Sequence, residues 1–415
     1  MALALASLLS LTGLQGCTGE LLPPRQSLHV LVVTNDENAW LTKEIRASEY
    51  WDSLLRAFQR LHPGVAVEIS VQPEHAFAES LSRSSFRGLA PDLLLVRAAT
   101  ANTMLARGLV DPLPLADPDL RRELNQITPQ ILRRVTTGRG IAALPMFSEF
   151  TLACFDRRRV PQPPATVDEL LALAASGRTV GLAVEPAGIW WTAGALGAQR
   201  ALLPILTGTA SAATAVQDRA SLVVWLRWLR QAALQNRVDI APSSRELTLA
   251  LESGEVSWIP CFSLTLQRLG RKLGPHLGVA ALPSGPGGAP TPYSSSRGWA
   301  LGRDSSPQQR RLALQLAMLS LDPLIQRSII FNLGMAVPAN SLVPLPVTSS
   351  SRLAALLAAR NQFEQTSPIL EAPFFLDRLQ QVVPPMETIL VEVMVGAMTA
   401  DQGARALQRL GVAAR

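Results

Sequence analysis

The side chains that most often carry catalysis or bind metal ions are sparse in this 415-residue chain. Its four histidines are isolated from one another and lack the spacing of metal ligands: His29, His62, His75 and His276. The sequence contains no Gly-x-Ser-x-Gly turn, no Gly-x-Gly-x-x-Gly turn, no phosphate loop ending in Gly-Lys-Ser/Thr and no His-Glu-x-x-His helix. We therefore expect no metal and no cofactor. A pair of carboxylates that meet from distant parts of the chain, as in a glycosidase, stays open as an alternative.

Tryptophans in predicted loops could instead bind a ligand by stacking. Aromatic residues make up only 5% of the chain, and Trp40 lies in the polar loop after the first predicted strand. Trp190 and Trp191 follow Glu-Pro-Ala-Gly in a corresponding loop of the middle part. Binding residues are often found on such loops, so we expect a cleft position for Trp40 and for at least one of the other two. The polar candidates for ligand contacts, each of which could also be an ordinary solvated charge, are Glu37, Glu149, Glu185 and Arg297.

The elements that would position these residues alternate between strands and helices. Apolar runs at 28–33, 65–71 and 92–96 predict strands, and apolar residues at helical spacing over 51–61 predict a helix between the first two. A Thr-x-x-Glu capping box at Thr166 predicts the start of a further helix. Strands alternating with helices indicate an α/β fold with a parallel sheet. In the remainder of the chain the patterns predict strands at 140–145, 256–262 and 278–283, helices at 221–235 and 245–253, and largely helical structure from 307 onward.

Composition excludes several classes of protein. The chain is 48% hydrophobic, which is ample for a large core, and its length favours two domains. The formal net charge is +6, but the basic residues are scattered and no aromatic residues are interleaved with a basic run. We therefore do not expect nucleic-acid binding.

The N-terminus resembles a bacterial lipoprotein signal. Residues 2–14 are apolar or small, a length that fits the apolar region of a secretory signal better than a membrane span. Leu14-Gln15-Gly16-Cys17 follows and looks like a lipobox, although the first basic residue is Arg25. The resemblance implies that 1–16 is removed, that Cys17 carries the lipid, and that 17–27 is a linker. The alternative is an ordinary buried N-terminal helix.

The two remaining cysteines, Cys154 and Cys261, lie in apolar, strand-like runs. Export permits a disulfide, but the spacing does not define one. We expect two separate buried thiols, since a free cysteine commonly behaves as a small core residue.

Several segments in a fixed order resemble the family 1 extracellular solute-binding proteins, which include sugar receptors of bacterial ABC importers. The match extends over nearly the whole mature chain, and the order of the segments is more specific than any one of them. The segments are Trp51–Leu61 leading through His62-Pro63-Gly64 into Val65, Ala90–Leu93, Ala106–Leu113, Leu144-Pro145, Pro164–Leu170, Leu251–Val256, Gly278–Pro283 and Arg297–Gly302.

The resemblance implies a two-lobed periplasmic-binding-protein fold of type II, with discontinuous lobes joined by hinge crossovers. Lobe one would comprise 28–145 and 291–345, and lobe two 146–290 and 346–415. The last of the matching segments resembles a Gly-Gly-Trp strand of several sugar receptors, which implies a stacking role for Trp299. Arginine stands at its first position, and a guanidinium at Arg297 would suit an acidic or phosphorylated ligand.

The implied function is capture of a small solute, such as a sugar, an oligosaccharide or a polyol, by hinged lobe closure. The protein would be a monomer without enzymatic activity, anchored by its lipid outside the cytoplasmic membrane, and its partner would be the ABC permease. A sensor or adaptor lipoprotein that keeps the fold without transport is the alternative.

Overall fold

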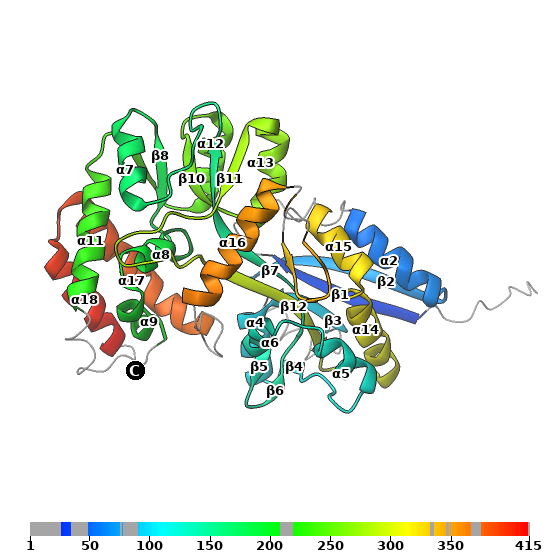
Figure 1. The fold of residues 1–415 in the computed structure, drawn as a ribbon. Coiled ribbons are helices and arrows are strands. Elements are labelled where there is room, and N and C mark those ends of the chain that lie inside the picture. The colour runs from blue at the N-terminus through cyan, green and yellow to red at the C-terminus, as the bar shows by residue number, and fades with distance from the viewer. Residues whose placement is uncertain are drawn as a thin grey trace, which may run out of the picture.

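The computed structural model describes residues 26–34, 49–74, 77, 90–207, 219–332, 336–345, 348, 350–366 and 375–413. The predicted lipidation site Cys17 and two of the predicted ligand residues, Glu37 and Trp40, lie outside these ranges. The fold is mixed α/β and two-lobed, with one lobe on each side of a long central strand (Figure 1). The predicted fold class is therefore confirmed.

The first lobe is built on strands in the order β2-β1-β3-β12-β7. β1 pairs in parallel with both β2 and β3, as the strand-helix alternation predicts, whereas β12 is antiparallel to β3 and β7. Short strands extend the sheet at β4, which pairs with β12, and at β13, which pairs with β7. The bounds are β1 (Gln26–Thr34), β2 (Val65–Pro73), β3 (Leu93–Arg97), β4 (Val110–Asp111), β7 (Leu144–Asp156), β12 (Ser294–Gly302) and β13 (Val337–Pro338).

Helices cover the faces of this sheet, and local sequence signals define their starts. Asp117 accepts hydrogen bonds from the first turn of α5, and Ser306 with Gln309 forms a reciprocal capping box at the start of α14. A two-residue-per-strand hairpin, β5 (Thr136–Thr137) with β6 (Gly140–Ile141), leads into β7. The helices are α2 (Glu49–Leu61), α4 (Ala98–Ala106), α5 (Pro118–Leu124), α6 (Pro129–Val135), α14 (Pro307–Leu319) and α15 (Pro323–Asn332).

The central strand β7 belongs to both lobes. Residues up to Phe150 pair with β12, whereas residues from Thr151 onward pair with β10 on one side and β11 on the other. All thirteen of its residues are buried. The core cluster that contains Leu144 is formed with β1, β3 and β12, and the clusters that contain Leu152 and Ala153 are formed with the strands of the second lobe.

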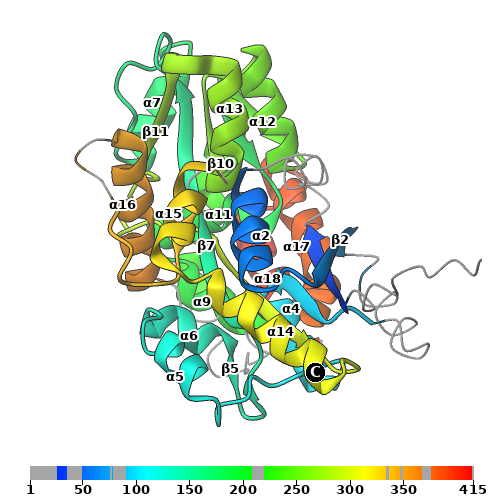
Figure 2. The same cartoon turned by 90° about the vertical axis from the view of Figure 1, so that its right-hand side faces the viewer.

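The second lobe continues from β7 through β10 and β8 to β9, with β11 on the opposite side of β7. The strands are β8 (Val180–Ala183), β9 (Val238–Ala241), β10 (Trp258–Phe262) and β11 (Leu277–Ala280). The C-terminal helices return to this lobe, where α16 packs on β7 and β11 and where α17 and α18 pack on α11 (Figures 1 and 2). The helices are α7 (Val167–Ala175), α8 (Pro186–Ala195), α9 (Gln199–Thr207), α11 (Arg219–Ala233), α12 (Ser244–Ser253), α13 (Leu266–Leu273), α16 (Ser351–Thr366), α17 (Phe375–Val395) and α18 (Ala400–Ala413).

At the start of α7, one of the two hydrogen bonds of the predicted capping box forms. Thr166 accepts a hydrogen bond from the backbone of Glu169, as expected. The Glu169 carboxylate accepts its bond from the backbone of Ala165 rather than from that of Thr166. Among the helices that the structure describes, none is both long and apolar enough to cross a membrane.

The expectation of two separate thiols is wrong, because Cys154 and Cys261 form a disulfide with a Cα–Cα distance of 5.8 Å. Cys154 is paired with Ile259 across the antiparallel β7–β10 ladder, which places Cys261 diagonally opposite on the same face of the sheet. The apolar character of both segments, which suggested core thiols, comes from this buried pair of strands.

Replacing both cysteines with alanine should lower the free energy of unfolding by about 2–4 kcal/mol, since the bond closes a long loop, with 107 residues of sequence separation. Urea unfolding of the oxidised protein and of the double variant would measure the difference. The oxidised protein treated with reductant should approach the stability of the variant. Equal stability of the oxidised protein and the variant would show that the bond does not stabilise the fold.

Candidate functional site

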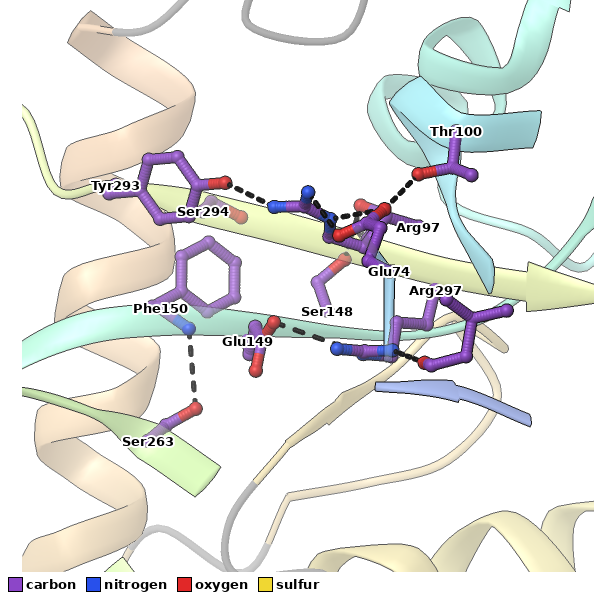
Figure 3. Close-up of polar contacts among 12 residues, drawn as sticks. Glu74, Arg97, Thr100, Ser148, Glu149, Phe150, Ser263, Tyr293, Ser294 and Arg297 are labelled. Atoms are coloured by element: carbon purple, nitrogen blue, oxygen red, sulfur yellow. Dashed lines mark hydrogen bonds and ion pairs between the residues drawn. The ribbon is translucent and has the colours of Figure 1, made fainter. Parts of the chain in front are cut away.

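Charged side chains gather where the parallel strands of the first lobe end, next to the strands that connect the lobes. Glu74 directly follows β2, and Arg97 is the last residue of β3. The two form an ion pair, with Arg97 Nε 3.1 Å from Glu74 Oε1, and Glu74 also accepts a hydrogen bond from Thr100 (Figure 3). Carboxyl ends of parallel strands are where α/β folds bind small molecules.

Both charges of this pair lie near the surface without being fully exposed, at 20% for the Arg97 side chain and 14% for Glu74. Burial alone would lower the pKa of the Arg97 guanidinium, but the neighbouring Glu74 carboxylate, with Tyr293 and Glu149, outweighs it and the pKa is raised. Arg97 is therefore a permanently charged donor held in place by a carboxylate.

A second charged pair, Glu149 with Arg297, lies on the strands that pass between the lobes. The sequence singled out both residues, and the structure places Glu149 Oε1 3.9 Å from Arg297 Nε (Figure 3). Arg297 also donates to the carbonyl of Val33 at the end of β1, 2.7 Å away. Arg297 is thus buried and engaged within the protein, a position that does not suit the predicted role of receiving an acidic ligand group.

The Glu149 carboxylate has an unused acceptor. Oε2 is buried and has no hydrogen-bond partner among the residues that the structure describes. Burial raises the pKa of Glu149, while Arg297, Arg97 and a hydrogen bond from Ser295 oppose that rise. An unsatisfied buried acceptor is costly, so a donor that reached Oε2 would bind there with a gain in free energy.

Two partly exposed aromatic rings lie beside these charges. The Tyr293 hydroxyl, just before β12, accepts a hydrogen bond of 3.4 Å from Arg97 Nη1, and the Tyr293 ring packs edge-on against Phe262 at 5.9 Å. Phe262 ends β10 in the second lobe. Rings from different strands, together with charged groups, can offer a stacking surface and hydrogen-bonding groups to the same ligand.

Glu185 occupies a different place, at the start of two helices of the second lobe. It is buried at the N-cap position of α8, and its Oε1 accepts a hydrogen bond of 2.8 Å from the backbone of Ser244, the first residue of α12. Burial, and then the charge of Glu185, raise the pKa of Glu387 on α17. Glu185 therefore links α8 to α12, and it also lies near a second carboxylate.

Trp190 and Trp191 lie on a helix, whereas the sequence predicted a loop. Pro186 opens α8 immediately after β8, and Gly188 lets the helix approach the sheet so closely that a Cβ there would lie 2.7 Å from the Ala183 side chain. Both indoles are buried in the core cluster of the second lobe, and Trp191 packs edge-on against Trp258 at 6.1 Å. The expectation that one of them lines an open cleft is corrected accordingly.

Trp299 is also a core residue. Its side chain is completely buried among the residues of the first lobe, and its indole N–H donates to Ser320 Oγ at 2.8 Å. Its neighbours in the β12 ladder, Leu95 and Leu144, are buried as well. Because this position offers no surface to a ligand, we assign Trp299 to the core rather than to stacking.

Four residues of this site, Glu74, Arg97, Phe262 and Tyr293, were not among those predicted from the sequence. A usable signal existed for the first two, because Arg97 directly follows the predicted strand 92–96 and Glu74 lies three residues after the predicted strand 65–71, where a ligand would be expected. Nothing comparable marked the two aromatic residues, whose proximity depends on how the lobes are joined. Among the described residues, no group of three or more His, Cys, Asp or Glu side chains could hold a metal ion.

The fold and these charged crossover strands define a two-lobed α/β binding protein. A family model described as bacterial extracellular solute-binding protein matches residues 42–316. The chain belongs to this family, as its sequence predicted.

Among the solved structures that share the fold are two that were determined with a saccharide bound. The GacH receptor of Streptomyces glaucescens, solved unliganded and with acarbose, aligns with a TM-score of 0.72 and 16% identity over 92% of this chain and 97% of that one. A maltotriose-binding protein of Thermus thermophilus aligns with a TM-score of 0.68 and 16% identity over 93% and 99% of the two chains. At such low identity these likenesses establish the fold alone.

Relatives with curated descriptions match more locally. A protein described as a binding protein in Brucella abortus is 24% identical over 139 residues, which is 33% of this chain and 34% of that one. The match thus spans about a third of the length of that relative.

Proposed function

We propose that this chain is the substrate-binding lipoprotein of a bacterial ABC importer, which captures a small sugar-like solute by closing its lobes. Membership of the solute-binding family and a fold shared with sugar receptors support this proposal. The observation that carries it is the buried, unpartnered Oε2 of Glu149, on a strand that connects the lobes. A ligand hydroxyl is a donor suited to that oxygen.

In this proposal several weak contacts combine. Micromolar affinity needs about −8 kcal/mol, and each hydrogen bond contributes only about 0.5–1.5 kcal/mol. Glu149, Glu74 and Arg97 would bind hydroxyls, and the rings of Tyr293 and Phe262 would pack on the apolar face of the ligand. Further proposed contacts are Glu185 in the second lobe and two residues of the sequence that follows β1, Glu37 and Trp40.

We also propose the location and the partner that the sequence predicted. Cys17 would carry the lipid that anchors it outside the cytoplasmic membrane, and the permease of the importer would be its partner. The receptor would be a monomer that releases its ligand chemically unchanged. Mass spectrometry of the bound and released sugar would test this last point, since hydrolysis would identify an enzyme.

A thermal-shift screen with sugars, polyols and glycerophosphodiesters would test the function. A ligand at 100 times its dissociation constant should add about 2.7 kcal/mol to the free energy of unfolding. Transport assays with the permease genes deleted would then separate import from sensing.

Replacing Glu149 with glutamine should weaken binding of the solute found in that screen at least about tenfold, because a charged acceptor is lost at the ligand. Isothermal titration calorimetry would measure the dissociation constant. The matched control is Glu252→Gln, which changes another largely buried, ion-paired glutamate, 12% exposed and paired with Arg268. If both variants bind like the unmodified protein, Glu149 does not contact the ligand.

A further inference from the structure

Two further carboxylates lie where the parallel strands of the second lobe end. Glu185 lies just after β8, and the register of the parallel pair β8–β10 places it one position beyond the level of Phe262, whose ring packs against Tyr293. Its carboxylate accepts a hydrogen bond from a neutral donor, the backbone N–H of Ser244. Burial, and then the negative charge of Glu185, raise the pKa of Glu387 on α17. Glu185 and Glu387 are therefore neighbouring carboxylates.

The helices of these two carboxylates, α8 and α17, lie on the same side of the sheet as Glu149. Side chains alternate along a strand, so Glu149 shares its face of β7 with Ala153 and Phe155. Those two residues belong to the core cluster that contains Trp190 of α8 and Met386 of α17. The side of the sheet to which Glu149 points is therefore the side that α8 and α17 cover.

The helix α17 also reaches the first lobe on this side. It packs against α4, the helix whose residue Thr100 donates a hydrogen bond to Glu74 (Figure 2). Glu74 belongs to the first lobe and Glu387 to the second. Carboxylates of both lobes therefore lie on this side of the junction.

The two arginines beside these carboxylates are engaged within the protein. Arg97 is ion-paired with Glu74. Arg297 donates to the carbonyl of Val33, and its Nε lies 3.9 Å from Glu149 Oε1, which is too long for a hydrogen bond. The Oε2 atom of Glu149 is buried and has no hydrogen-bond partner among the described residues. Within this described group, four carboxylates are set against two arginines, and a buried acceptor still lacks a donor.

We infer that the solute is a sugar or polyol that carries a protonated amine, which donates to Glu149 Oε2 and whose charge Glu185 and Glu387 stabilise. A hydroxyl could donate to this oxygen as well, but it brings no charge, whereas an ammonium group supplies several donors and a positive charge. Hydrogen bonds between charged groups are about twice as strong as those between neutral groups. The inference rests on the proposed function, since it specifies the solute that the site would bind.

Matched pairs of sugars test the inference on the full chain. Isothermal titration calorimetry would compare glucosamine with glucose, deoxynojirimycin with glucose, and the fully deacetylated trisaccharide of chitosan with cellotriose. In at least one pair the amine should bind about tenfold more tightly than its neutral counterpart. The N-acetylated form of that amine, where the nitrogen is a neutral amide, should lose this advantage.

Two variants assign the preference for the amine to residues. Glu149→Gln should remove most of it, because the amide that replaces the carboxylate carries no charge. Glu387→Gln should reduce the ratio of the two affinities about two- to fivefold, since it removes a charge that acts at a distance. Glu392→Gln is the matched control on the same helix and should leave the ratio unchanged.

The outcomes separate the amine from the importer. Equal or tighter binding of the neutral sugar in every pair would overturn the amine and leave the proposed function standing. Binding of no sugar in either series would count against both. A preference for the amine that persists in folded Glu149→Gln would overturn the contact with Glu149.

Discussion

Arg297→Met should lower the free energy of unfolding by about 3–5 kcal/mol, because it leaves the buried Glu149 carboxylate without its ionic partner. The Glu149 side chain is 3% exposed and that of Arg297 7%, so water cannot replace the lost charge. The carbonyl of Val33 would lose a donor in the same variant. Chemical denaturation followed by far-UV circular dichroism would measure the loss.

Two companion variants separate the charge from the packing in this experiment. Glu149→Leu combined with Arg297→Met should recover part of the loss, since a buried ion pair replaced by apolar groups is often tolerated. Arg122→Met removes an arginine from an ion pair whose two side chains are both exposed, that with Asp119, and should cost no more than about 1 kcal/mol. A loss as small in Arg297→Met as in Arg122→Met would contradict the importance of the crossover pair.

Trp299→Ala should destabilise the first lobe by about 3–5 kcal/mol, the usual cost of deleting a large buried aromatic side chain. The indole also donates a hydrogen bond to Ser320 Oγ, so the variant would leave this hydroxyl without that donor beside the new cavity. Thermal unfolding would report the change. The effect on ligand binding should follow from lost folded protein and not from a lost ligand contact.

Trp299→Phe distinguishes a core role from a stacking role. This variant keeps a ring in the core and should retain the solute affinity of the unmodified protein, with a much smaller loss of stability than the alanine variant. A stable Trp299→Ala protein that no longer binds the solute would restore the stacking role that the sequence suggested.

Much of the fold could be predicted because the relevant signals are local. Alternating and continuous apolar runs predicted β1, β2 and β3, and helical spacing predicted α2, α11 and α12. The capping residue Thr166 lies where its sequence context indicated. These patterns reflect burial of one face or of a whole strand, which a short window of sequence already contains.

The errors concern properties that depend on contacts between distant segments. Whether Cys154 meets Cys261 depends on the register of β7 with β10, and the sequence does not specify that register. Whether Trp299 faces a ligand or the core depends on which face of β12 is covered by the first lobe. Trp190 was misplaced because a four-residue strand, β8, leads directly into α8 with no long loop between them.

The candidate site was predictable in part for the same reason. Glu149 and Arg297 were selected separately as polar residues, but their pairing arises only when β12 and β7 lie side by side. The predicted boundary between the lobes at residues 145 and 146 falls inside β7, a single strand of thirteen residues. Sequence patterns identify individual strands and helices. Here the boundary between the lobes and the candidate site both lie on a single strand, β7.

That shared strand also limits how the molecule can be divided. A fragment that ended before β7 would also lack β12, which follows β7 in the chain, and would leave β3 without its antiparallel partner. A fragment that began after β7 would lack the strand that lies between β10 and β11. The two halves have separate core clusters, but these clusters are all built on the same strand. Chimaeric proteins made from two relatives should therefore exchange β7 together with its neighbouring strands in both halves. A join placed between the two lobes would separate β7 from those strands.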